Sequence, residues 1–268
     1  MELFEAHFAN LRGNLYYDTH ADSYELFSGK GVGHHINHLT FKALFEQMGM
    51  PKSPIILESG IASRGTQSTY LFNEVVRKYG GRFWSVDNDP ELVATHRGNM
   101  CPGTELVCDD SVAFFKEWAK ASADTKASDD TKASADTKAS ADTKASADTK
   151  ASGQASGQAS AKNPHVDVIY LDSYDLDFYN PEPSGKHGLA EYNALKPVIG
   201  KDTLMLIDDT PISPEWLDTR GQTYRDMQHF YTDTGIMPGK GMYVLDEVLN
   251  AEKLIHNYQV LYKFRGKP

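Results

Sequence analysis

Residues 54–65 read Pro-Ile-Ile-Leu-Glu-Ser-Gly-Ile-Ala-Ser-Arg-Gly, and this stretch decides the fold. The short apolar run Pro54–Glu58 is typical of a buried strand, and the glycines after it indicate a tight turn. An amphipathic pattern then continues to Gly80, as expected of a helix. Glycines after a buried strand let the backbone approach a ligand at the carboxyl edge of a sheet. The stretch therefore predicts a strand, a ligand-binding loop and a helix.

Short apolar runs alternate with helical patterns along the rest of the chain. Further strands are predicted at 82–87, 105–108, 166–171 and 203–207. The last two predicted strands, 242–245 and 258–264, lack a full helical crossover, so we expect an antiparallel pair at one edge. Alternating strands and helices indicate an α/β fold with a doubly wound, mostly parallel seven-stranded sheet.

Two other segments complete the predicted domain organisation. Residues 1–50 carry two helical patterns and are expected to form a helical lid or substrate segment before the main domain, 51–268. Residues 119–162 interrupt that domain with a low-complexity repeat of the form ASADTK. This repeat contains no bulky apolar residue, so burial cannot offset its ordering entropy, and we expect a disordered insertion.

Composition excludes several classes of partner. The net charge of −10 argues against nucleic acid or an anionic membrane. The cysteines, Cys101 and Cys108, form no CxxC pattern and indicate neither a disulfide framework nor a zinc site. No apolar run reaches the roughly 20 residues of a membrane span, and the N-terminus lacks the pattern of a signal peptide. We expect a cytoplasmic protein whose oligomeric state the sequence leaves open.

A loop near the N-terminus is rich in histidine. His34, His35 and His38 could lie on one face of a helix and form a metal site. No cysteine or acidic partner accompanies them, which makes a role in the lid the better interpretation.

Acidic residues end each of the first three predicted strands. They are Glu58, Asp87 and the pair Asp109–Asp110, which Ser111 follows. Asp87 could accept both hydroxyls of a ribose, and the third-strand acids could meet an adenine amino group. A carboxylate after the first strand would repel a pyrophosphate, and the loop lacks the GxGxxG spacing. Each acid alone could cap a helix, but together they favour a nucleoside with a positive charge and no phosphate.

These motifs resemble class I S-adenosylmethionine-dependent methyltransferases over 54–264, apart from the repeat. Glu58 and Gly60 match that family's acid-x-Gly loop, and Asp87 and Asp110 match its second-strand and third-strand acids. The resemblance implies S-adenosylmethionine as cofactor. The cofactor site that it implies consists of Glu58, Gly60, Ser63, Gly65, Asp87, Asp110 and Ser111. Four residues separate the two loop glycines, where related O-methyltransferases often have three.

A second group of acids, Asp172, Asp208 and Asp209, follows the fourth and fifth predicted strands. Adjacent parallel strands bring such carboxylates close together, and a Mg²⁺ or Ca²⁺ ion would relieve their repulsion. The spacing resembles that of metal-dependent catechol-type and sugar O-methyltransferases, which implies Asp172 as a catalytic metal ligand. The ion would lower the pKa of a substrate hydroxyl and orient its oxygen. Alternatively, Asp208 and Asp209 cap the turn before Pro211.

The predicted catalytic base is His187. Catechol-type enzymes have a lysine three residues after the fourth-strand acid, but this chain has Asp175 there. His187 stands at the start of the next helix and has a suitable pKa for a base, with a surface or capping histidine as the alternative.

The sequence thus predicts a Mg²⁺-assisted O-methyltransferase that uses S-adenosylmethionine. Its acceptor is expected to be a small hydroxylated molecule, a sugar or a secondary metabolite. The alternatives are an NAD-dependent oxidoreductase on a similar layered fold and a catalytically silent scaffold of the methyltransferase fold.

Overall fold

The computed structural model of the chain describes residues 1–11, 15–18, 23–26, 35–49, 52–122, 165–218 and 225–268. The repeat beyond residue 122 and His34 lie outside the described residues. None of the helices in the described ranges is long and apolar enough to cross a membrane.

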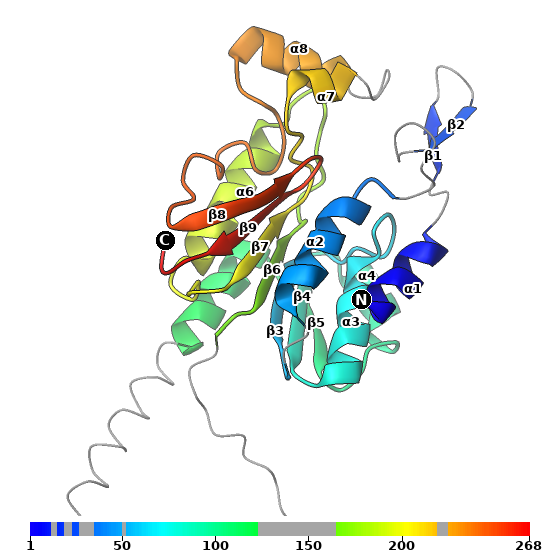
Figure 1. The fold of residues 1–268 in the computed structure, drawn as a ribbon, viewed down its shortest axis with the longest axis vertical. Helices are drawn as coiled ribbons and strands as arrows, with labels where there is room; N and C mark the ends of the chain where they lie inside the picture. The colour runs from blue at the N-terminus through cyan, green and yellow to red at the C-terminus, as the bar shows by residue number, and fades with distance from the viewer. Residues whose placement is uncertain (12–14, 19–22, 27–34, 50–51, 123–164, 219–224) are drawn as a thin grey trace, which may run out of the picture.

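A seven-stranded sheet runs through the centre of the molecule (Figure 1). Its strands are β3 (Ile55–Ser59), β4 (Arg82–Asp87), β5 (Thr104–Cys108), β6 (Val168–Leu171), β7 (Leu204–Ile207), β8 (Ala251–His256) and β9 (Val260–Phe264). Their order in the sheet is β5-β4-β3-β6-β7-β9-β8. Among these strands, β9 alone runs in the direction opposite to the other six. The predicted doubly wound sheet with an antiparallel C-terminal strand pair is confirmed.

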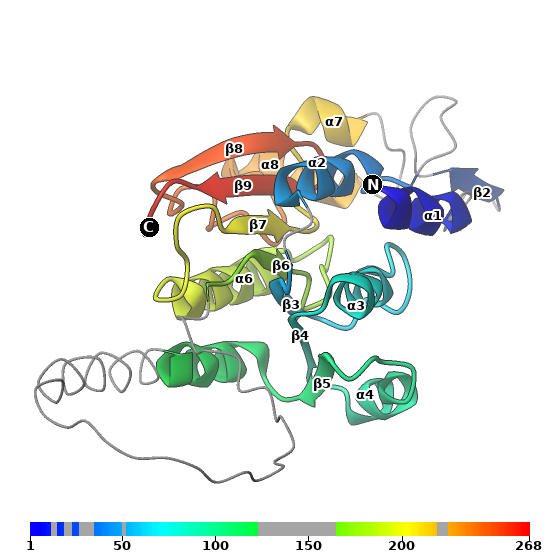
Figure 2. The same ribbon diagram turned by 60° about the horizontal axis from the view of Figure 1, so that its bottom comes forward.

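Helices cover both faces of the sheet (Figure 2). One face carries α1 (Glu2–Asn10), α2 (His38–Met48), α3 (Ser68–Tyr79) and α4 (Pro90–Arg97). The other face carries α6 (Glu182–Leu195) and a helix over residues 111–122. Side chains that alternate along β3 explain the two layers, because Ile56 is buried with Phe72 of α3 and Leu57 is buried with Tyr192 of α6.

The N-terminal segment is helical at both ends, as predicted. Phe4 and Phe8 of α1 and Phe41 of α2 are buried in the same cluster as Ile56 and Phe72. Between these helices in the sequence are two strands, β1 (Leu15–Asp18) and β2 (Ser23–Leu26), which form a separate antiparallel pair. The sequence patterns did not indicate this pair. The role of residues 1–50 as a lid stays a prediction.

The predicted strand at 242–245 was wrong. These residues form a turn in which the amide of Val244 donates to the carbonyl oxygen of Gly241 at 2.9 Å. The strand that forms the antiparallel C-terminal pair with β9 is β8, which lies later in the chain than residues 242–245. Val244 is buried in the core beside α6, which explains its apolar pattern. A buried turn and a buried strand have the same apolar composition over so few residues, so periodicity could not separate them.

Two short helices lie together at one end of the molecule, at the top of Figure 1. They are α7 (Pro214–Asp218) and α8 (Arg225–Thr234). Leu217 and Met227 from these helices are buried with Ile36 and Tyr258 in a small cluster of their own. This cluster fixes the chain that follows α8, which contributes to the site described below.

A pair of histidines on the N-terminal helical layer predicts acid sensitivity. Burial, and then the neighbouring His7, lowers the pKa of His35 to about 4, and burial lowers the pKa of His7. Because an unfolded histidine has a pKa near 6.5, the unfolded chain binds more protons, and stability falls as the pH drops from about 6.5 to about 4. Thermal unfolding followed by circular dichroism should show this fall, and His35→Gln should make it shallower. An equal slope in the variant would contradict the assignment to His35.

Candidate cofactor site

The register of the parallel strands brings several predicted site residues into one row. Ser59 pairs with Val86 and Leu171, Asp87 pairs with Cys108, and Leu171 pairs with Ile207. The residues that immediately follow these strands, with Asp87 itself, therefore share one edge of the sheet. They are Gly60, Asp109, Asp172 and Asp208.

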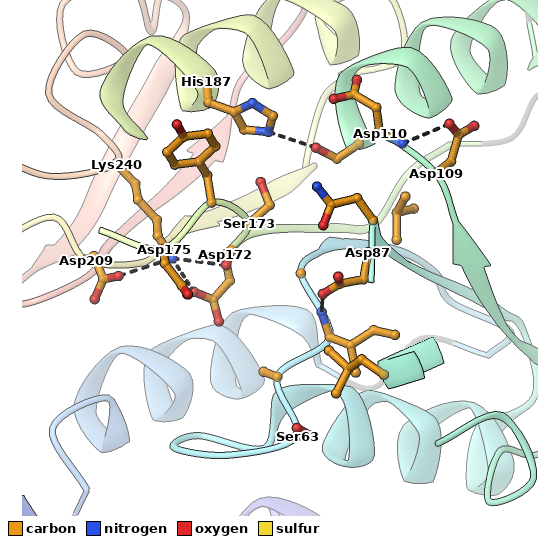
Figure 3. Close-up of a pocket in the computed structure, with 18 of the residues that line it drawn as sticks. Ser63, Asp87, Asp109, Asp110, Asp172, Ser173, Asp175, His187, Asp209 and Lys240 are labelled. Carbon is orange, nitrogen blue, oxygen red and sulfur yellow. Dashed lines mark hydrogen bonds and ion pairs between the residues drawn. The ribbon is translucent and has the colours of Figure 1, made fainter. Parts of the chain in front are cut away.

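A cavity of about 650 Å³ opens at this edge (Figure 3). Its lining includes the predicted residues Gly60, Ser63, Asp87, Asp110, Ser111, Asp172, His187 and Asp209. Three other predicted residues, Glu58, Gly65 and Asp208, are not part of the lining. The cavity also takes in Lys240, which the sequence patterns did not single out.

Gly60 is required by both its backbone conformation and its surroundings. Its φ is +83°, and a Cβ placed there would lie 2.6 Å from the carbonyl oxygen of Asp172. Its amide donates to the carbonyl oxygen of Val86 at 2.8 Å. Gly65 also has a positive φ, +59°, but a Cβ there would meet nothing within 4 Å. Close approach of the β3 and β6 ends thus depends on the missing side chain of Gly60. At Gly65, glycine is favoured only by the positive φ of the backbone.

Glu58 supports the loop from beneath and does not line the cavity. Its carboxylate is fully buried and accepts hydrogen bonds from the hydroxyls of Ser68 at 2.6 Å, Thr69 at 2.7 Å and Ser85 at 2.6 Å. Thr69 Oγ1 in turn accepts from the amide of Ala62 in the loop at 2.9 Å. Burial raises the pKa of Glu58 to about 7, although the three hydroxyls partly offset this effect. The direct cofactor contact predicted for Glu58 is replaced by this indirect support.

Two acids of the lining also hold backbone amides. Asp87 Oδ2 accepts from the amide of Ile61 at 2.9 Å, and Asp87 Oδ1 accepts from the amide of Asp89 at 2.9 Å. Asp110 Oδ1 accepts from the amide of Ala113 at 2.8 Å, in the first turn of the helix over residues 111–122. Asp87 therefore fixes the loop after β3, and Asp110 caps a helix while it lines the cavity.

A hydrogen-bonded network surrounds His187. Its Nε2 lies 3.0 Å from Ser111 Oγ and 3.3 Å from Glu191 Oε1. Glu191 is buried and also accepts from the hydroxyl of Ser173 at 2.6 Å. The hydrogen bond to Glu191 is the largest cause that raises the pKa of His187. Sequence reasoning missed Glu191, although its position one helical turn after His187 was a usable signal.

Lys240 lies between two of the predicted metal ligands (Figure 3). Its Nζ is 2.7 Å from Asp172 Oδ1 and 3.1 Å from Asp209 Oδ2, and it donates to the carbonyl oxygen of Asp172 at 3.0 Å. The lysine side chain is 6% exposed. Burial alone would lower the pKa of Lys240, but the charges of Asp172, Asp209 and then Asp208 outweigh burial and raise it. The lysine is therefore a fixed cation.

Asp208 is held by a different set of partners. Its Oδ2 accepts from the Tyr170 hydroxyl at 2.8 Å, and its Oδ1 accepts from Gln259 Nε2 at 2.8 Å and from Asn37 Nδ2 at 3.4 Å. These partners come from β6, from the chain before β9 and from the residue before α2. Burial, and then the charge of Asp208, raises the pKa of Asp172 well above its ordinary value. The acids are close enough to interact, but they are not gathered around one point.

The strand order now identifies the architecture. Five parallel strands in the order β5-β4-β3-β6-β7 are extended by antiparallel β9 and then β8, and a glycine-containing loop follows β3. This is the class I methyltransferase fold. No protein-family model matches the sequence, and a search of curated proteins gave no match.

Solved structures with this fold align with the chain at low identity. The SAH-bound methyltransferase PaMTH1 of Podospora anserina is 13% identical, with a TM-score of 0.46, and the alignment covers 98% of this chain and 88% of that one. Human N-acetylserotonin methyltransferase, solved with SAM, is 10% identical, with a TM-score of 0.40 and coverage of 85% and 52%. CalS10 of Micromonospora echinaspora, an amino pentose methyltransferase solved with SAM, is 11% identical, with a TM-score of 0.33 and coverage of 73% and 57%. The chain spans little more than half the length of the latter two.

The carboxylates as they lie do not fit the predicted Mg²⁺ or Ca²⁺ ion. Within the described ranges, no three His, Cys, Asp or Glu side chains form a group that could hold a metal. A divalent ion at this position would have to coordinate the carboxylate oxygens of Asp172 and Asp209. The ammonium of Lys240 lies between these two carboxylates and pairs with both of them. Asp208 faces Tyr170 and Gln259 instead. As they lie, two of the predicted metal ligands, Asp172 and Asp209, form an ion-pair cluster with Lys240.

Proposed function

We propose that this protein is an S-adenosylmethionine-dependent methyltransferase that acts on a hydroxyl group of a small acceptor, a sugar or a secondary metabolite. The observation that carries the proposal is the composition of the cavity at the carboxyl edge of the sheet. Its lining combines the glycine loop at Gly60 with carboxylates at the ends of successive strands, including Asp87, Asp110 and Asp172. Such a lining suits a nucleoside with a positive charge and no phosphate.

The cavity fits this cofactor in two respects. A Cβ at Gly60 would lie 2.6 Å from the carbonyl oxygen of Asp172, so glycine lets the ends of β3 and β6 approach closely at the cavity wall. The acids outnumber the basic residues in the lining, which are Arg64, His187 and Lys240. Lys240 is already paired with two acids. A sulfonium and an ammonium group would therefore enter a favourable field, whereas phosphates would not.

The residues of the chain contribute mainly position and charge. When bound, S-adenosylmethionine supplies a methyl group on sulfur, which passes to the acceptor oxygen and leaves S-adenosylhomocysteine. Asp87 holds the amide of Ile61 and so fixes the loop against which the cofactor rests. A rigid loop of this kind keeps reacting atoms in line, which is the principal source of rate in such a transfer.

The acceptor hydroxyl must lose a proton, and His187 is the proposed base. It lines the cavity, and the buried carboxylate of Glu191 fixes its ring through Nε2. Tyr174 packs against the His187 ring with centroids 5.3 Å apart and restricts it further. Mg²⁺ or Ca²⁺ is not part of the proposal, because the ammonium of Lys240 already pairs with both Asp172 and Asp209.

Calorimetry with S-adenosylhomocysteine tests the proposed cofactor. The full chain should bind S-adenosylhomocysteine and not NADH, because the cavity offers carboxylates where NADH needs a pyrophosphate site. Binding of NADH alone would favour the oxidoreductase alternative. Cofactor binding without methyl transfer to any of a panel of hydroxylated acceptors, with radiolabelled methyl donor, would favour the silent scaffold.

Asp87→Ala should weaken S-adenosylhomocysteine binding by about 100-fold, since two charge-assisted hydrogen bonds to backbone amides are lost, each worth about 1.5–3 kcal/mol. The matched control is Asp89→Ala, two residues away and outside the cavity lining. Asp89 caps α4 through the amides of Glu91 and Leu92, so its loss should lower thermal stability with little change in affinity. Equal affinity losses in the two variants would contradict the proposed role of Asp87 in fixing the loop after β3.

A further inference from the structure

Lys240 uses its whole hydrogen-bonding capacity on the ends of two strands. An ammonium group has three N–H donors, and Nζ has three acceptors within reach: Asp172 Oδ1 at 2.7 Å, the Asp172 carbonyl oxygen at 3.0 Å and Asp209 Oδ2 at 3.1 Å. Asp172 follows β6, and Asp209 follows β7 by two residues. The lysine therefore joins two neighbouring strand ends through their carboxylates.

The backbone around Lys240 is built into the fold. The amide of Lys240 donates to the carbonyl oxygen of Asp209 at 3.0 Å, and the amide of Gly241 donates to Thr210 Oγ1 at 3.0 Å. A Cβ at Gly239, whose φ is +139°, would lie 2.2 Å from the carbonyl oxygen of Asp209. A Cβ at Gly188 of α6 would lie 2.4 Å from the carbonyl oxygen of Lys240. This close packing fixes the lysine against the end of β7 and against α6.

The ammonium takes the place that a divalent cation would need. The sequence places three acids at adjacent strand ends, and such a group requires a counter-charge in a buried setting. Lys240 supplies that charge to Asp172 and Asp209 directly, while neutral donors from Tyr170 and Gln259 satisfy Asp208. A lysine and a divalent ion cannot share the same carboxylate oxygens, because the two cations repel each other at that distance.

We infer that Lys240 is a positioning residue that replaces a divalent cation at the ends of β6 and β7, so that this site binds no metal in its working form. The reaction context rests on the proposed function, but the claim about metal binding does not. The lysine holds the Asp172 and Asp209 side chains in place on the cavity wall. Removing the charge of Lys240 should leave two uncompensated carboxylates, which can then bind a metal ion.

Electron paramagnetic resonance of Mn²⁺ with the full chain tests this inference. The wild-type protein should show no saturable Mn²⁺ binding at millimolar concentration. Lys240→Met, which removes the charge but keeps an extended side chain, should bind one equivalent. The matched control is Lys78→Met, because Lys78 pairs with Glu2 at 2.9 Å on the surface, away from the cavity. That control should behave like the wild type.

Two further variants keep the inference testable if Lys240→Met folds poorly. Lys240→Arg retains a cation and should exclude Mn²⁺. The double variant Lys240→Met with Asp209→Asn removes one charge of each sign and should recover part of the thermal stability lost in Lys240→Met. Additive effects on the midpoint of thermal unfolding would overturn the inferred pairing.

The wild-type measurement is decisive on its own. One Mn²⁺ bound by the wild-type chain and lost in Asp172→Asn would overturn the inference and restore the metal predicted from the sequence. Failure of a folded Lys240→Met to differ from the wild type in Mn²⁺ binding and in stability would also overturn it. Calorimetry with S-adenosylhomocysteine on the same samples tests the proposed function separately. A wild-type chain that does not bind S-adenosylhomocysteine would reject the proposed function and leave the inference about Lys240 unaffected.

Discussion

Gly60→Ala should weaken the binding of S-adenosylhomocysteine by roughly 100-fold or more. The new Cβ would lie 2.6 Å from the Asp172 carbonyl oxygen, a backbone atom that cannot move away by changing a rotamer. Overpacking costs about 1–3 kcal/mol, and a side chain in the left-handed region adds about 1–2 kcal/mol. Because the strain falls on the junction of β3 and β6 in the cavity wall, we expect the dissociation constant to rise by roughly 100-fold or more.

Gly65→Ala is the matched control for this experiment. Gly65 lies in the same loop with φ +59°, but a Cβ there would meet nothing within 4 Å. The control should lose about 1–2 kcal/mol of stability for its backbone conformation and keep its affinity within about tenfold. Calorimetry measures the affinities, and circular dichroism of each variant shows whether it is folded. A folded Gly60→Ala that binds as well as Gly65→Ala would contradict the assigned cofactor site.

His187→Ala should lower kcat by about 10²–10⁴-fold if the histidine accepts the acceptor proton. The affinity for S-adenosylhomocysteine should stay the same, because the proton that His187 accepts comes from the acceptor and not from the cofactor. Transfer of a radiolabelled methyl group to hydroxylated acceptors measures the rate. His229→Ala, on the exposed side of α8, is the control and should keep full activity. A loss of cofactor affinity with unchanged kcat would instead assign His187 to the nucleoside end of the cavity, beside Ser111.

Glu191→Gln adds a pH readout to the same test. The hydrogen bond and charge of Glu191 raise the pKa of His187, so the histidine stays protonated to a higher pH in the wild type. Only the neutral form can accept a proton, and rate should therefore rise with pH through the pKa of His187. In Glu191→Gln this rise should move to lower pH. A rise at the same pH in both proteins would contradict His187 as the base.

Local sequence patterns were sufficient for the architecture and for one half of the site. The runs around Ile56, Ile169 and Met205 predict buried strands because each is apolar over the length of a strand and a helical pattern follows it. Parallel strands put their carboxyl ends at one edge, so residues after them, such as Gly60 and Asp110, could be placed near a ligand from position alone. The error at 242–245 arose where the apolar run was short and the burial came from a turn.

Other parts of the site depend on contacts between distant segments. Lys240 follows Asp172 by 68 residues, and it reaches that carboxylate only because of the path of the chain after α8. Nothing in the local sequence of 236–241 distinguishes this lysine from a surface lysine. The surroundings of Glu58 could not be predicted from the local sequence either. Its position in the loop motif suggested a contact with the cofactor, but three hydroxyls from α3 and β4 surround its carboxylate.

Local sequence patterns alone were enough to predict the parallel strands with their helices, the glycine loop after β3 and the acidic edge of the sheet. These features follow from apolar periodicity and from residues next to one another in the chain. The tertiary structure decided which charge compensates that edge. An ion pair depends on distances of a few ångströms between side chains, and the close packing of Gly239 against Asp209 sets those distances. The acids were visible in the sequence, and their cationic partner became visible only in the fold.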